Sequence, residues 1–232
     1  MKSKEHRERR RVMRTESERL LESFCRVNGV AYRPVVETTE RRPDYELEIA
    51  GQRVLAEVKQ FDPNEEERAA ASRIARGEAV VLGATPGGKL RPAIREANRQ
   101  LRQLLAGRSI PTILVVYNNT ECSLHTRPYA VMTAMQGLDV VDVVVPMQPG
   151  EPLRSGAVRS GRAGRAMRPD ANTSTSAVAV LVVLNPKEFG LTVYHNRFAA
   201  SPLDPNLMRF PGVRHFRLPI ATNSVEAAWG EI

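Results

Sequence analysis

The sequence has few aromatic side chains, few cysteines and no long apolar run. Phe, Trp and Tyr make up 5% of the residues, so extended stacking platforms for single-stranded bases are not evident. The two cysteines, Cys25 and Cys122, lie far apart without Cys or His at zinc spacing, which favours a reducing compartment. The longest apolar run, at 177–184, is too short to cross a bilayer as a helix. No apolar run follows the basic N-terminal residues, so we expect a cytoplasmic protein with no secretory signal and no membrane partner.

Positive charge is concentrated in two segments. The formal net charge is +8, which favours a polyanionic partner. Residues 1–14 hold seven basic and two acidic side chains, and residues 151–170 hold five arginines and two acids, so these segments account for the whole excess. We interpret 1–14 as a basic N-terminal arm, either solvated or bound to phosphates. The Arg/Gly/Ser-rich stretch at about 150–175 is predicted to be a mobile loop, either without a role or ordered on nucleic acid. Its candidate nucleic-acid-binding residues are Arg154, Arg159, Arg162, Arg165 and Arg168.

Apolar and polar residues alternate through residues 43–59, PDYELEIAGQRVLAEVK. The alternation stops near Gly51 and then resumes, which predicts two strands joined by a tight turn. On such a hairpin Asp44 lies on one face of the first strand with the acids at alternate positions, while Glu57 and Lys59 share one face of the second. Two carboxylates and an ammonium group can therefore converge.

This set of groups suits metal-dependent phosphate chemistry. Mg²⁺ prefers oxygen ligands and usually takes one or two protein carboxylates together with waters and substrate phosphate oxygens. Lys59 could orient a metal-bound water or stabilise charge on the attacked phosphorus. Charges at Glu57 and Lys59 within the apolar strand VLAEVKQF would be costly to bury if they were not needed. The alternative is an ordinary amphipathic hairpin with a solvated acidic face and a surface ion pair between Glu57 and Lys59.

The order Pro-Asp, about a dozen residues, then Glu-Val-Lys resembles the PD-(D/E)XK, or restriction-endonuclease-like, nuclease superfamily. The resemblance implies a mixed sheet with Asp44 and Glu57 as ligands of Mg²⁺, for which Mn²⁺ can substitute, and Lys59 as the catalytic lysine. It also implies a metal-dependent endonuclease that hydrolyses phosphodiester bonds in double-stranded or branched DNA. By analogy with two-strand cleavage, a homodimer is expected. Gln60, directly after the lysine, is either a neighbour of the site or a solvated strand end.

Upstream residues resemble archaeal Holliday junction resolvase-like members of that superfamily. In those members a glutamate on the first helix precedes a glycine that ends the helix, and the chain then enters the first strand. Here Glu18 opens ERLLESFCRVNG, Gly29 follows, and VAYRPVV comes next. The resemblance therefore implies Glu18 as a third catalytic acid, with Glu22, one helical turn on, as the competing choice. It covers residues 15–60.

A second motif points to different chemistry. Gly83, Gly88 and Lys89 have the spacing of a phosphate-binding P-loop. Leu90, however, stands where such a loop needs Ser or Thr to hold Mg²⁺, and no later strand ends in a convincing Walker B carboxylate. We prefer a flexible connector and keep a nucleotide-binding module as an alternative. Another alternative is a catalytically silent nucleic-acid-binding or assembly subunit with the nuclease fold.

The helix that begins at Leu90 has the clearest periodicity in the chain. Its apolar residues recur at steps of three and four until Gly107. Its opposite side carries four arginines, which are either solvated or directed at phosphates: Arg91, Arg95, Arg99 and Arg102.

The whole pattern predicts a single α/β domain over residues 15–232, with a restriction-endonuclease-like core at about 15–120. Helix, three strands, helix, strand is the core order of the superfamily. Further helices are predicted at 64–76 and around 128–135. Strands at 139–146, 177–185 and 191–198, with an edge strand VRHFRL, are expected to extend the sheet. His125 and His195 are isolated in the sequence, and we assign neither a catalytic role.

Overall fold

The structure is a computed structural model, and it describes most of the 232-residue chain. The described residues are 14–35, 42–81, 83, 85–105, 107–120, 123–137, 139–144, 146, 152, 154–160, 164–185, 187–217 and 230–232, without the side chains of 103, 139–142, 144 and 157–160. Residues 1–13 of the predicted basic arm, Cys122, Arg162 and the side chain of Arg159 lie outside this description.

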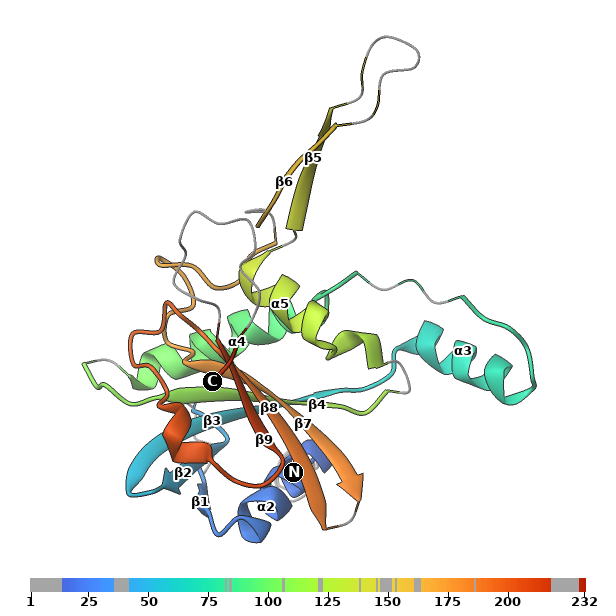
Figure 1. The fold of residues 1–232 in the computed structure, drawn as a ribbon. Helices are drawn as coiled ribbons and strands as arrows, with labels where there is room; N and C mark the ends of the chain where they lie inside the picture. Colours follow the sequence, from blue (N-terminus) through green and yellow to red (C-terminus); the bar gives the residue numbers. More distant parts are fainter. Residues whose placement is uncertain are drawn as a thin grey trace, which may run out of the picture.

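Helices and strands alternate along the described chain (Figure 1). The helices are α2 (Glu16–Val27), α3 (Glu65–Ala75), α4 (Leu90–Leu104) and α5 (Pro128–Gln136), with short 3₁₀ helices η1 (Ser123–His125) and η2 (Pro205–Met208). The strands are β1 (Ala31–Pro34), β2 (Tyr45–Ile49), β3 (Gln52–Phe61), β4 (Thr112–Asn118), β5 (Asp139–Val144), β6 (Arg154–Ser160), β7 (Ala177–Asn185), β8 (Glu188–His195), β9 (Val213–Arg217) and β10 (Gly230–Glu231). No helix in the described ranges is long and apolar enough to cross a membrane.

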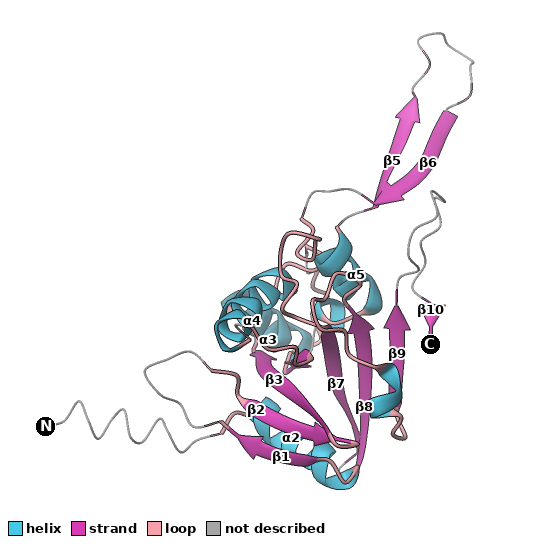
Figure 2. Ribbon diagram, turned by 90° about the vertical axis from the view of Figure 1, so that its left-hand side faces the viewer, coloured by secondary structure: helices cyan, strands magenta, loops and turns pink. Residues whose placement is uncertain are grey.

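Eight of these strands form one mixed sheet, in the order β1-β2-β3-β4-β7-β8-β9-β10 (Figure 2). β1, β2 and β3 pair antiparallel, while β3, β4 and β7 pair parallel. β8 joins β7 antiparallel and β9 in parallel. The described chain is therefore an α/β protein with four helices and an eight-stranded mixed sheet, and the predicted helix, three strands, helix, strand order is present, with α3 inserted before α4.

The predicted hairpin is confirmed as β2 and β3. Its two-residue turn, Ala50 and Gly51, has positive φ values of 49° and 78°, the backbone that suits the right-handed twist of paired strands. The pairing begins at Ile49 opposite Gln52. Because β3 also pairs with β4, residues in its second half lie inside the sheet and not at an edge.

Helices cover both faces of the sheet, with α2 on one side and α4 and α5 on the other (Figure 1). α2 packs on one face through Leu21, Phe24 and Cys25, against alternate residues of β2 and β3 and the buried side of β4 and β7. α4 and α5 pack on the other face, where Leu55 of β3 and Ile94 of α4 belong to one buried hydrophobic cluster. Since side chains alternate along a strand, the residues of β3 that face α4 are Leu55, Glu57, Lys59 and Phe61, whereas Val54, Ala56, Val58 and Gln60 face α2.

The C-terminal half departs from expectation at two places. β5 does not extend the sheet, because it pairs with β6 in a separate two-stranded sheet that stands away from the core (Figure 1). β6 and the docked segment after it occupy the stretch predicted to be a loop at about 150–175. In that segment Ala166 and Met167 are buried, and their backbone N–H groups donate to the carbonyls of Ala134 and Met135 on α5. The expectation of an unpaired loop is therefore wrong for β6 and for residues 166–167, because Gly/Ser/Arg composition does not show which backbone partners a segment finds. The mobility expected for the stretch stays a prediction.

The glycine-rich turn before α4 has a packing role. Gly87 has φ +71°, and a Cβ there would lie 2.8 Å from the Ala134 nitrogen and 2.9 Å from the Ala130 oxygen of α5. A side chain would therefore meet rigid helix backbone as well as an unfavourable φ. Close approach of the turn to α5 explains this glycine without a bound phosphate.

Gly87→Ala should lower the free energy of unfolding by roughly 2–4 kcal/mol, because backbone strain and overpacking add. Gly77→Ala is the matched control, since Gly77 has φ +80° but no atom lies within 4 Å of the position that its Cβ would take. It should lose only about 1 kcal/mol from strain. Urea unfolding of both variants measures the difference, and equal losses would contradict the proposed packing.

Candidate active site

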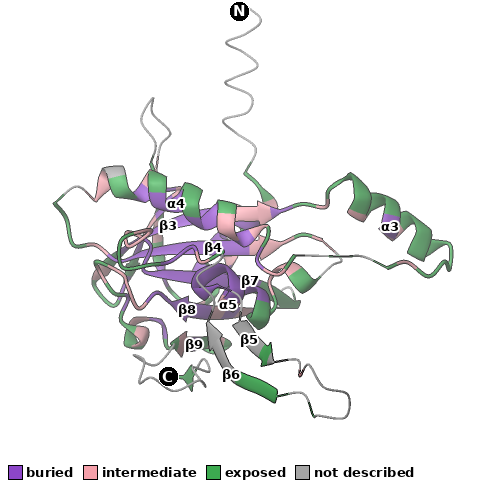
Figure 3. Cartoon of the chain, turned by 90° about the horizontal axis from the view of Figure 1, so that it is seen from above, coloured by how far each residue is buried: buried purple, intermediate pink, exposed green. Residues whose placement is uncertain are grey.

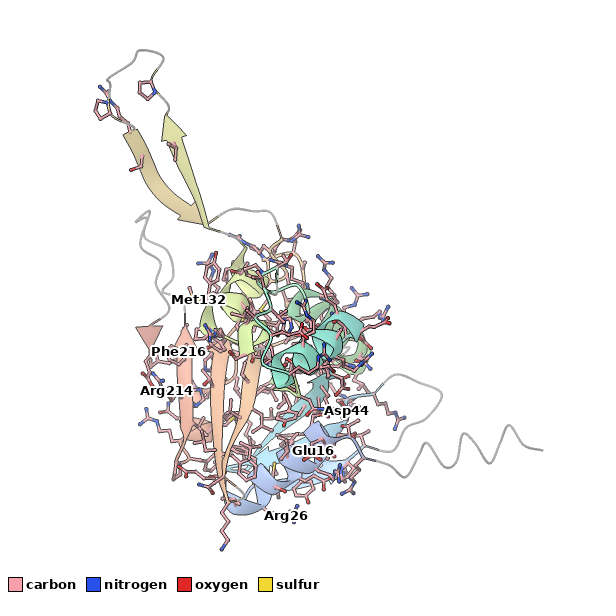
Figure 4. All side chains as sticks on the ribbon, turned by 90° about the vertical axis from the view of Figure 1, so that its right-hand side faces the viewer. Glu16, Arg26, Asp44, Met132, Arg214 and Phe216 are labelled. Atoms are coloured by element: carbon pink, nitrogen blue, oxygen red, sulfur yellow. The ribbon has the colours of Figure 1, made fainter. Side chains whose placement is uncertain are left out.

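The register of the hairpin brings Asp44 and Glu57 together. β2 and β3 pair with Tyr45 opposite Ala56, so the next position along places Asp44 opposite Glu57, on the same face. The Val58 N–H donates to Asp44 Oδ2 at 2.7 Å, which fixes the Asp44 carboxylate against β3. In Figure 4 Asp44 lies at the rim of the sheet, between α2, where Glu16 is labelled, and the helices of the other face.

Glu57 is a buried acid. Glu57 is 1% exposed. Burial, together with the negative charge of Asp44, raises the pKa of Glu57 to about 7, although the positive charge of Lys59 acts to lower it. Its Oε1 lies 3.0 Å from Lys59 Nζ. Its Oε2 is buried and has no hydrogen-bond partner within the described residues. A buried carboxylate oxygen without a partner is unfavourable unless another group binds it.

Lys59 lies between two glutamates. Its Nζ is 3.0 Å from Glu57 Oε1 and 3.3 Å from Glu96 Oε1 on α4. Burial by itself would lower the pKa of Lys59, but attraction to Glu57 and then Glu96 outweighs burial and raises it. Lys59 is therefore held as a cation next to Glu57. Glu57 in turn lies close enough to Asp44 to feel its charge, so Glu57 connects the three groups of the motif.

Glu96 is the residue that sequence reasoning missed. It lies on the exposed side of α4, 37 positions from Lys59 in sequence, so no local pattern links the two. The available signal was that Glu96 is the single acid in a helix with four arginines, LRPAIREANRQLRQL.

The residues present suit a divalent cation that brings other ligands of its own. The described residues contain no group of three His, Cys, Asp or Glu side chains that could hold a metal by themselves. Asp44 and Glu57 supply two carboxylates, and Mg²⁺ commonly binds to one or two carboxylates plus waters and substrate phosphate. A cation would also pair with the unpartnered Glu57 Oε2. The donor set therefore fits Mg²⁺ or Mn²⁺ bound together with substrate.

The two helix glutamates lie on α2, which packs on the opposite face of the sheet from Glu57. Glu18 belongs to a capping box: its Oε2 accepts from the Thr15 backbone N–H at 2.5 Å and from the Thr15 hydroxyl at 2.8 Å. Glu22 is 4% exposed, pairs with Arg14, and accepts a 2.8 Å hydrogen bond from the Tyr45 hydroxyl. Burial, followed by the contact with Glu22, raises the pKa of Tyr45. The described contacts of Glu18 therefore cap the N-terminus of α2, whereas the contact of Glu22 with Tyr45 fixes α2 on the hairpin.

Gln60 also fastens α2 to the sheet. Its side-chain oxygen accepts from the Ser17 backbone N–H at 3.0 Å, and its Nε2 donates to Asp62 Oδ1 at 2.6 Å. It faces α2, whereas Lys59 faces α4. The described contacts of Gln60 are thus with the scaffold next to the site and not with Glu57 or Lys59.

The predicted nucleic-acid-binding arginines are dispersed. Arg154 is exposed at the start of β6, in the small separate sheet. Arg165 donates through Nε to the Gln136 carbonyl at 2.8 Å, and Arg168 pairs with Asp170 at 3.3 Å. Two of the five are therefore engaged by the chain itself.

The remaining candidate motifs have structural partners. Lys89 Nζ lies 2.7 Å from Glu67 Oε2, and His125 Nε2 contacts the other oxygen of Glu67. Burial would raise the pKa of Glu67, but hydrogen bonds from Lys89, Asn64 and His125 outweigh it and lower that pKa to about 2. This cluster ties α3 to the start of α4 and to η1. Lys89, the lysine that a P-loop would use to bind phosphate, is thus paired with Glu67.

No family model, no curated protein and no solved structure matches this chain. Asp44, Glu57 and Lys59 define the candidate site by their geometry and by the motif they form.

Glu57→Gln should remove a pH dependence of stability. A carboxyl whose folded pKa is about 7 and whose ordinary value is 4.5 stabilises the fold fully below pH 4.5, and that contribution is lost as the pH rises through 7. Each pKa unit corresponds to about 1.4 kcal/mol. Thermal unfolding in chelator at pH 5 and pH 8 should show the parent losing stability relative to Glu57→Gln at the higher pH.

Glu66→Gln serves as the control, because Glu66 is an exposed acid on α3. It should change the pH dependence little. A parent and a Glu57→Gln variant with parallel pH profiles would contradict the raised pKa of Glu57.

Proposed function

We propose that the protein is a Mg²⁺-dependent nuclease of the PD-(D/E)XK, restriction-endonuclease-like kind, which hydrolyses phosphodiester bonds in DNA. The observation that carries the proposal is that buried Glu57 lies opposite Asp44 in the strand register and 3.0 Å from Lys59, while its other oxygen, Oε2, has no hydrogen-bond partner among the described residues. The mixed sheet and the element order from α2 to β4 agree with that fold. An ordinary surface hairpin does not account for Glu57, because the residue is 1% exposed.

Each site residue has a defined part in the reaction. Asp44 and Glu57 would hold the cation, which supplies charge stabilisation at the phosphate and a more acidic bound water. Asp44 is oriented by the Val58 N–H, and Glu57 by Lys59. Lys59 is positioned to hold the attacking water by hydrogen bonding or to stabilise negative charge on the phosphate oxygens. Hydrolysis adds water across one P–O bond and leaves one end with a phosphate and the other with a hydroxyl.

Glu18 and Glu22, the two candidates for a third acid, have different roles in the proposal. Glu22 is bound by Tyr45 and Arg14, so its role is to hold α2 on the hairpin. Glu18→Gln separates capping from catalysis, because glutamine also completes a capping box but carries no charge. A loss of cleavage in Glu18→Gln with unchanged thermal stability would assign Glu18 as the third acid.

Lys59→Ala and Asp44→Asn should each lower the rate of Mg²⁺-dependent cleavage at least a hundredfold, since one electrostatic group of this kind contributes about 3 kcal/mol to barrier lowering. Binding of duplex in chelator should be nearly intact. The measurement is product formation from linear, branched and single-stranded DNA and RNA, with Mg²⁺, Mn²⁺ or chelator.

The control is Lys187→Ala, which removes an exposed lysine from the turn between β7 and β8. It should cleave like the parent. Cleavage that persists in Lys59→Ala and Asp44→Asn would remove the proposed chemistry from this site. Nucleic-acid binding by the parent without cleavage of any substrate would favour the catalytically silent subunit instead.

A further inference from the structure

Helix α4 carries three exposed arginines that the proposed reaction does not use: Arg95, Arg99 and Arg102. None of the three has a hydrogen-bond or ion-pair partner in the part of the chain that the structure describes. Other exposed arginines are neutralised by carboxylates at 2.6–2.9 Å, as in the pairs of Arg19 with Glu16, Arg33 and Arg53 with Glu46, and Arg73 and Arg76 with Glu78. We call Arg95, Arg99 and Arg102 the α4 arginine ridge.

The spacing of the ridge matches a charged linear ligand. Residues at steps of four and three lie on one side of a helix. With a rise of about 1.5 Å per residue, the ridge from Arg95 to Arg102 is about 10 Å long. A nucleic-acid strand carries one phosphate per roughly 3.4 Å of helix axis, so the ridge spans about three phosphates of one strand.

The helix presents this ridge from a fixed position. Ile94, Ala97 and Leu101 on its opposite side are fully buried against the sheet, and Figure 3 shows α4 with an exposed outer side above the buried strands. The guanidinium groups therefore extend from a rigid backbone and not from a loop. Less backbone freedom is lost when such a surface binds a ligand.

The ridge borders the candidate site. Glu96 follows Arg95 directly and precedes Arg99 by three positions, so Glu96 and Arg99 are neighbours on the helix surface. Glu96 is the one acid of α4 and it accepts from Lys59 at 3.3 Å. The carboxylate that could neutralise the ridge is thereby directed to the site, and the positive charge of the ridge stays available.

A groove elsewhere on the protein does not offer the same charge. It has a volume of about 490 Å³ and lies on β1, β2 and β3, where it is lined by Arg33, Glu46, Glu48 and Arg53 among others. Glu46 pairs with Arg33 at 2.9 Å and with Arg53 at 2.6 Å. Two arginines and two glutamates leave this groove formally neutral, which does not favour a polyanion.

We infer that the α4 arginine ridge binds the sugar-phosphate backbone of the polynucleotide whose phosphodiester bond lies at Asp44, Glu57 and Lys59. The inference rests on the proposed function, which it deepens: the substrate is a continuous strand or duplex that extends several nucleotides across α4 from the cleaved bond. Arginine suits this contact because its guanidinium stays charged and binds phosphate oxygens in pairs.

Binding of a fluorescent 30-base-pair duplex in chelator tests the ridge separately from cleavage. In the triple variant Arg95→Ala, Arg99→Ala, Arg102→Ala, affinity near 0.1 M salt should fall on the order of tenfold to a hundredfold. The slope of log affinity against log salt should become shallower by about 2 to 3, because each phosphate contact contributes roughly 0.9. Alanine is a strong helix former, so α4 should persist, and a thermal melt checks this.

The matched control removes three ion-paired arginines elsewhere: Arg19→Ala, Arg73→Ala, Arg76→Ala. It loses the same formal charge, and its affinity should fall less than threefold. A second variant, with lysine at the three ridge positions, should keep most of the salt slope because lysine also binds phosphate as a point charge.

The outcomes distinguish the ridge from the nuclease activity. Equal losses of affinity in the ridge and control variants would contradict the inference that the α4 arginine ridge binds phosphates, whether or not the parent cleaves DNA in Mg²⁺. A selective loss in the ridge variant would support the ridge even if the parent cleaved nothing, in which case the proposed function alone would fail. Single-stranded DNA and duplex RNA identify the preferred polynucleotide, and equally tight binding of polyglutamate of matched charge would overturn the assignment to nucleic acid.

Discussion

The candidate site depends on one electrostatic constraint: the carboxylate of Glu57 is buried next to that of Asp44. Burial disfavours the charged form of a carboxyl group, and a second negative charge disfavours it further, which is why the pKa of Glu57 rises to about 7. Lys59 relieves part of this repulsion through Oε1, whereas Oε2 has no described partner. A divalent cation bound to both carboxylates would relieve the remaining repulsion between Asp44 and Glu57. The arrangement therefore suits a cation-binding site.

The scaffold is built to hold this unfavourable arrangement in register. The tight turn at Ala50 and Gly51 sets Asp44 opposite Glu57, and pairing of β3 with β4 keeps the second half of β3 inside the sheet. α2 is fastened to the hairpin through Glu22 and Tyr45 and through Gln60. On the face of the sheet opposite α2, α4 contributes Glu96, which accepts a hydrogen bond from Lys59. A one-residue slip of β2 would turn Asp44 away from Glu57, so these contacts protect the site as well as the fold.

Local patterns in the sequence were sufficient for the hairpin, α2 and α4, because alternation, capping residues and a three-four periodicity act over a few residues. They also placed Glu57 and Lys59 on one face of the second strand for the same reason, which the structure confirms. They could not identify Glu96, whose link to Lys59 exists only once α4 packs on β3, nor the partners of Lys89, because Glu67 and His125 come from separate segments. Strand β6 was missed since its Arg/Gly/Ser composition hides pairing that is set by β5.

Direct measurement of metal binding tests the central claim that Asp44 and Glu57 form one cation site. Mn²⁺ binding, followed by electron paramagnetic resonance at pH 8 with a non-cleavable phosphorothioate duplex present, should show one tightly bound ion per chain in the parent and in Lys187→Ala. Asp44→Asn and Glu57→Gln should each lose that ion, because either change leaves a single carboxylate. Undiminished binding in both variants, or no bound ion in the parent, would contradict the account.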